Sequence, residues 1–153
     1  MDVQIWSIDP VKMAYAEHTG PYNEIGAAWE KLCAWAGPAG HFNATTRFYG
    51  VFYDDPATVE PQKLRSEACI TVGADVPASA DINVRDFQGG KYAVAVHLGP
   101  YEKLVDSWSE FYGSWLPGSG MDMGQGPCME QYMNDPMTTK PEHLVTLLLL
   151  PLK

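Results

Sequence analysis

The chain contains few basic residues. Its 153 residues include 10 Lys and Arg against 19 Asp and Glu, which gives a formal net charge of −9. Binding to nucleic-acid phosphates or to an anionic membrane surface depends on clustered Lys and Arg, so we expect no direct binding to nucleic acid or membrane. An acidic balance instead suits solubility, a cationic ligand or a basic protein partner.

Cysteines are also scarce. Cys33, Cys69 and Cys128 form an odd set without Cys-x-x-Cys spacing, which argues against a disulfide framework or a zinc site. We expect them to be small buried side chains, and we expect no metal and no cofactor. No Ser-His-Asp or Cys-His constellation is apparent. His18 and His97, each just before a Gly-Pro pair, are expected to make structural hydrogen bonds.

Long apolar runs are missing. The longest, 147–152, is far too short to span a membrane. The first residues show no basic segment followed by an apolar one, so no signal peptide is expected and the cytoplasm is the expected compartment. An apolar share of 46% and a charged share of 19% are typical of a globular chain, and the length fits one domain.

The chain does contain an internal repeat. The stretch at 14–22, Ala-Tyr-Ala-Glu-His-Thr-Gly-Pro-Tyr, recurs 79 residues later at 93–101 as Ala-Val-Ala-Val-His-Leu-Gly-Pro-Tyr. The same offset relates Trp29 to Trp108. After one inserted residue the offset becomes 80, and Asp55-Pro56 corresponds to Asp135-Pro136. We therefore expect a single domain, 1–153, made of two pseudo-symmetric repeats at 1–73 and 81–153.

Each repeat is expected to form a β-β-α-β-β unit. Alternating or aromatic-rich stretches predict strands, and an apolar stripe at helical spacing predicts a helix after each Gly-Pro pair. The expected strands are 3–8, 11–18, 47–53, 64–72, 82–87, 91–98, 128–133 and 144–150, with helices starting at 22 and 101. A Gly-rich loop is expected at 117–126. Hairpin-length links predict an antiparallel sheet, and hence an α+β fold with eight strands and two helices.

Three segments carry a resemblance to a known family. They are 89–96, Gly99-Pro100-Tyr101, and 127–136, which contains the pattern Glu-x-Tyr-x-Asn-Asp-Pro. With these segments, essentially the whole chain resembles the GyrI-like small-molecule-binding family. That family includes the DNA gyrase inhibitory protein and the effector-binding domains of multidrug-responsive AraC-type and MerR-type regulators. No helix-turn-helix precedes the domain, so the standalone form is expected. The resemblance implies a concave antiparallel sheet with a central groove between the two helices.

Glu130 is the first candidate ligand-binding residue. Strand alternation places it on one face with Cys128 and Tyr132. The corresponding residues of the first repeat carry no charge: Phe48, Gly50 and Phe52. A buried carboxylate needs a hydrogen-bond network, a raised pKa or a ligand that neutralises it. The resemblance implies that a glutamate here contacts lipophilic cationic drugs. The alternatives are an exposed carboxylate or a structural bond to a tyrosine.

Aromatic side chains form the second candidate set. Tyr22 and Trp29 mirror Tyr101 and Trp108 in the repeat. Aromatic faces beside a carboxylate attract organic cations, whereas aromatic residues at helical spacing commonly pack in a core, and both interpretations stay open. The complete set of predicted ligand-binding residues is Glu130, Tyr132, Tyr101, Trp108, Tyr22, Trp29 and Phe52.

Three functions remain open. The first is a binding protein that captures lipophilic, cationic or aromatic compounds and protects against them. The second, implied by the resemblance, is inhibition of DNA gyrase by protein contact. The third is a hydrolase of electrophilic cyclopropane-containing genotoxins, as some family members are described. In a hydrolase, Glu130 would act as general base, and Tyr101 or Tyr132 would hydrogen-bond the developing oxyanion. Binder and enzyme would share one groove, so the sequence does not separate them.

Overall fold

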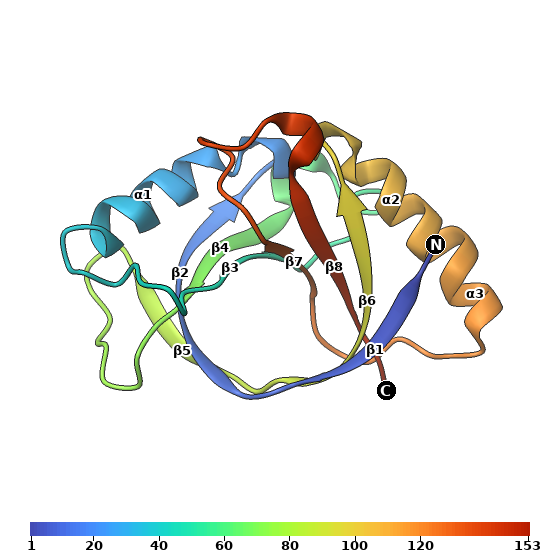
Figure 1. The fold of residues 1–153 in the computed structure, drawn as a ribbon, viewed down its shortest axis with the longest axis horizontal. Helices are drawn as coiled ribbons and strands as arrows, with labels where there is room; N and C mark the ends of the chain where they lie inside the picture. The colour runs from blue at the N-terminus through green and yellow to red at the C-terminus, as the bar shows by residue number, and fades with distance from the viewer. The chain divides into compact units, whose positions relative to one another are not determined.

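Two compact units make up the structure, a computed structural model that describes residues 1–153 (Figure 1). One unit comprises 9–89, and the other comprises 1–8 and 90–153. Each unit contains four strands, and every neighbouring pair within a unit is antiparallel. The predicted α+β fold with eight antiparallel strands is confirmed.

The unit at 9–89 is a sheet with one helix along it. Its elements are β2 (Val11–Thr19), α1 (Gly26–Ala36), β3 (Phe48–Phe52), β4 (Arg65–Thr71) and β5 (Asn83–Phe87), with the strand order β3-β4-β2-β5. Helix α1 lies along β2 and β4 (Figure 1). Apolar side chains at helical spacing, Ala28, Leu32 and Ala36, are buried there against Ala14, Ala16, Ala68 and Ile70 of the strands.

The second unit has the same plan with a longer helical layer. Its elements are β1 (Val3–Ile8), β6 (Gly90–Leu98), α2 (Leu104–Glu110), a π-helical turn (Phe111–Trp115), α3 (Leu116–Ser119), β7 (Cys128–Tyr132) and β8 (Val145–Pro151), with the strand order β1-β6-β8-β7. The core contains Ala93, Ala95, Phe111, Leu148 and Leu150. None of the helices has the length and hydrophobicity that a membrane span requires.

The predicted loop at 117–126 is wrong at its start. Residues 117–119 continue the helical layer as α3, because Pro117 occupies a first-turn position, where a proline is tolerated. The helix ends at Gly120, whose φ of 72° is the left-handed conformation that glycine adopts without strain.

The first strand of each repeat lies in the unit formed by the other repeat. β1 pairs with β6, with Val3 opposite Ala95, while β5 pairs with β2, with Phe87 opposite Val11. In Figure 1 the blue β1 accordingly lies beside the yellow β6. The two sequence repeats are thus interleaved by the exchange of one strand.

The strand registers repeat as the sequence does. Ala14 lies opposite Ile70, and Ala93 opposite Leu150. On the next strand pair, Gly50 lies opposite Ala68, and Glu130 opposite Leu148. Gly50 and Glu130 therefore occupy equivalent positions in their own units.

The turn after β2 and the turn after β6 are built alike. The Nε2 atom of His18 lies 2.9 Å from the carbonyl oxygen of Pro21, and that of His97 lies 3.1 Å from the carbonyl oxygen of Pro100. The expected structural hydrogen bonds are confirmed. A glycine with φ between 124° and 133° makes each turn possible.

Candidate functional site

Glu130 is buried on β7. Its side chain faces the helical layer, since its neighbour on β8 is the core residue Leu148. Only 6% of Glu130 is exposed. Its carboxylate accepts two hydrogen bonds, one from Nε1 of Trp108 at 3.4 Å and one from the hydroxyl of Tyr132 at 3.1 Å. The expected burial is present, and so is the bond to a tyrosine that was the structural alternative to ligand binding.

Burial dominates the ionisation of Glu130. Removal from water raises its pKa from 4.5 to about 7, although the hydrogen bonds from Trp108 and Tyr132 lower it. Both donors are neutral groups, so they stabilise the carboxylate without cancelling its charge. Near neutral pH the protonated and ionised forms of Glu130 are therefore both populated.

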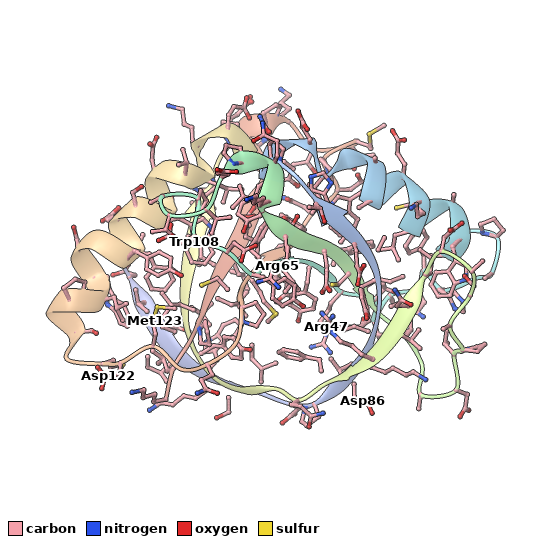
Figure 2. All side chains as sticks on the ribbon, turned by 180° about the vertical axis from the view of Figure 1, so that it is seen from behind. Arg47, Arg65, Asp86, Trp108, Asp122 and Met123 are labelled. Carbon is pink, nitrogen blue, oxygen red and sulfur yellow. The ribbon has the colours of Figure 1, made fainter.

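Three predicted aromatic residues lie near Glu130 in the same unit: Trp108 and Tyr132, which donate to its carboxylate, and Tyr101, which contacts Tyr132. The rings of Tyr101 and Tyr132 meet edge to face, with their centroids 5.6 Å apart. Figure 2 shows Trp108 on the side of α2 that faces the strands, where it packs against the core of the unit. Burial and then the charge of Glu130 raise the pKa of Tyr101, which keeps its hydroxyl protonated at neutral pH.

Two further side chains lie at this site. The hydroxyl of Tyr112 lies 2.6 Å from Sγ of Cys128, and the ring of Tyr112 lies 5.8 Å from that of Trp108. Cys128 shares a strand face with Glu130, two residues away. Tyr112 fits the apolar helical stripe that the sequence predicts, so its place beside Cys128 and Trp108 was missed. Burial raises the pKa of the Cys128 thiol, while the contact with Tyr112 lowers it.

The remaining predicted residues belong to the unit at 9–89. The rings of Tyr22 and Phe52 meet edge to face at 4.9 Å, and the hydroxyl of Tyr22 donates to the carbonyl oxygen of Asp54 at 2.6 Å. Trp29 packs near Phe48, with their centroids 6.4 Å apart. Tyr22, Trp29 and Phe52 stay predicted ligand contacts, and the central groove stays a prediction.

The geometry around Glu130 suits two kinds of chemistry. A buried carboxylate edged by aromatic rings attracts an organic cation, and a carboxyl group with a pKa near 7 transfers protons readily. No group of three or more His, Cys, Asp or Glu side chains is arranged to hold a metal ion.

The structure is a duplicated α+β unit with a buried carboxylate among aromatic rings. The family model described as "GyrI-like small molecule binding domain" matches residues 1–153. The chain belongs to this family, and the resemblance carried by 89–96, 99–101 and 127–136 is confirmed.

Relatives agree with this assignment. A protein of Erwinia billingiae named DNA gyrase inhibitor is 32% identical over 141 residues, which cover 88% of each chain. The crystal structure of the EcmrR C-terminal domain superposes with a TM-score of 0.80 at 13% identity, covering 99% of this chain and 97% of that one. The structure of SAV2435 bound to tetraphenylphosphonium superposes with a TM-score of 0.66 at 17% identity, covering 100% and 94%. At these identities the two structures show the shared fold.

Proposed function

We propose that the protein binds lipophilic organic cations, with Glu130 as the counter-charge and with Tyr101, Trp108 and Tyr132 as aromatic contacts. The observation that carries this proposal is the burial of a carboxylate whose hydrogen-bond donors are both neutral. A buried negative charge in this state is incompletely compensated, and a ligand that brings a weakly hydrated positive charge compensates it.

The surroundings of Glu130 favour a diffuse cation over a compact one. An aromatic face beside a cation contributes about 0.5–2 kcal/mol, and the apolar substituents of such a ligand gain further free energy when they leave water. A strongly hydrated ammonium ion lacks the second contribution. The net charge of −9 also raises the local concentration of cations of either kind.

Titration calorimetry with tetraphenylphosphonium tests the proposal. Glu130→Gln keeps the shape of the side chain and removes its charge, and we expect affinity to fall by roughly thirtyfold or more, the loss typical of removing one partner of a buried charge pair. Glu142→Gln, at an exposed position, is the matched control because it changes the net charge equally. Unchanged affinity in Glu130→Gln, or equal losses in both variants, would refute the proposed role.

A hydrolase is the second candidate, and the raised pKa of Glu130 favours it. With a pKa of about 7, the group could take a proton from water, while Tyr132 or Tyr101 donates to the developing oxyanion. Incubation with a cyclopropane-bearing DNA-alkylating compound, followed by mass spectrometry, tests this activity. A product heavier by one water that is absent with Glu130→Gln would support it, and unchanged compound after many hours would refute it.

Two biological roles follow as finer proposals. Capture of toxic cations would protect a cell, and expression of the protein should then raise the growth-inhibitory concentration of tetraphenylphosphonium. The relatives named DNA gyrase inhibitor suggest gyrase as a protein partner. A supercoiling assay with a large molar excess of the protein tests the latter role, and full supercoiling activity would rule it out.

A further inference from the structure

The two helical layers differ by one inserted residue. Trp108 follows Trp29 by 79 positions, whereas Trp115 follows Trp35 by 80. Both Trp35 and Trp115 pack against the core of their own unit. The insertion therefore lies between Trp108 and Trp115, in the repeat that also carries Glu130.

The structure shows how this insertion is accommodated. Residues 111–115 form a π-helical turn, whereas α1 continues without one through Ala36. A single residue added to an α-helix produces such a wide turn, and the residues after it keep the orientation that they had before the insertion. Trp115 thus occupies in its unit the position that Trp35 has in the other, and the wide turn holds the extra residue.

The wide turn contains Tyr112. Its hydroxyl contacts Cys128, its ring approaches Trp108, and Trp108 donates to the carboxylate of Glu130. Forty per cent of Tyr112 remains exposed. At this helix position the first repeat has Cys33, which has no aromatic ring.

Two departures from the repeat symmetry therefore meet at Trp108. One is the carboxylate of Glu130 in place of Gly50, and the other is the π-turn with Tyr112. The unit at 9–89 forms the same fold without either of them. Folding therefore does not account for them, and their meeting at one indole ring points to a shared role.

We propose that Tyr112, carried by the π-turn, is a specificity-determining residue that selects cations bearing aryl groups at the Glu130 site. This inference rests on the proposed function. The ring of Tyr112, which is 40% exposed, would contact an aryl substituent while the cationic centre approaches Glu130. An alkyl cation of similar size gains much less from the same ring.

Affinities for tetraphenylphosphonium and tetrabutylphosphonium test the selection. Tyr112→Leu should weaken tetraphenylphosphonium binding about tenfold and change tetrabutylphosphonium binding less than twofold. Tyr112→Phe, which keeps the ring and loses the contact with Cys128, should bind both cations as the parent does. Equal losses for the two cations in Tyr112→Leu would overturn the inference.

Deletion of Gly113 tests the part assigned to the π-turn. Gly113 is exposed, and its removal should restore the helical spacing of α1 without altering far-ultraviolet circular dichroism. We expect tetraphenylphosphonium affinity to fall to the level of Tyr112→Leu, and unchanged affinity would refute the role of the π-turn.

The variants also separate this inference from the proposed function. A loss of affinity in Glu130→Gln together with none in Tyr112→Leu would overturn the role of Tyr112 alone. Unchanged binding in Glu130→Gln would instead remove the proposed function itself.

Discussion

Arg85 on β5 is paired with Glu67 on β4 across the intervening strand β2. The guanidinium donates two hydrogen bonds to the carboxylate and lies over the ring of Tyr15, 4.1 Å from its centroid. Tyr53 donates a further bond to Glu67 at 2.9 Å. The residues at the equivalent positions of the other unit are Trp6 and Leu147, which carry no charge.

Replacing Arg85 by Met should destabilise the protein by about 3 kcal/mol, because Glu67, only 6% exposed, would keep a buried charge without its cation. Partial exposure of the arginine places the effect at the low end for buried pairs. Urea unfolding measures the change. The double variant Glu67→Leu/Arg85→Trp copies the other unit and should recover at least half of the loss. A double variant less stable than Arg85→Met would contradict this explanation.

The stability contribution of Glu130 should decrease as the pH rises. Its pKa is about 7 in the folded chain against an ordinary value of 4.5, so between these values the folded state holds more protons than the unfolded state. The contribution is complete below pH 4.5 and is lost as the pH rises through 7. Glu130→Gln stays neutral, so it should be more stable than the parent at pH 8. The difference in free energy of unfolding between variant and parent should be on the order of 3 kcal/mol larger at pH 8 than at pH 5. The same difference at both pH values, in thermal unfolding, would refute a raised pKa.

Cation binding should depend on pH in the opposite sense. A cation favours ionised Glu130, so binding below pH 7 releases a proton from this group. As the pH is lowered below 7, the apparent affinity for tetraphenylphosphonium should therefore fall about tenfold for each pH unit. Calorimetry in buffers of different ionisation enthalpy counts the proton. In Glu130→Gln both the proton release and the pH dependence should disappear. Proton release retained in that variant would assign it to another group.

Local patterns predicted most of the fold, because apolar and polar residues recur along each strand or helix at the spacing typical of that element. The alternation at 3–8 corresponds to β1 without a shift, and the Gly-Pro pairs mark both helical layers. The burial of Glu130 also followed from alternation and from the uncharged residues of the first repeat. Such arguments succeed where neighbours in sequence are neighbours in space.

Features that depend on distant residues were not predictable in this way. β1 and β5 would show the same alternation whether each paired within its own repeat or with the other repeat. No local pattern therefore predicts which strand each of them pairs with. Tyr112 fits an apolar helical stripe equally well with or without a π-turn. The sequence does contain one signal of the π-turn: the repeat offset is 79 at Trp29 and 80 at Trp35. This change indicates a π-turn only when the structure shows where the extra residue lies.

The strand exchange has a direct test in a truncated chain that lacks residues 1–8. These residues include β1, whose backbone pairs with β6 from Val3 opposite Ala95 to Ile8 opposite Gly90. Removing them leaves β6 as an unpaired edge, so its amides that bonded to β1 should lose protection in hydrogen–deuterium exchange. The amides of β2 should keep their protection, because their partners are β4 and β5. If β2 lost protection and β6 retained it, β1 would pair within its own repeat and the exchange would be refuted.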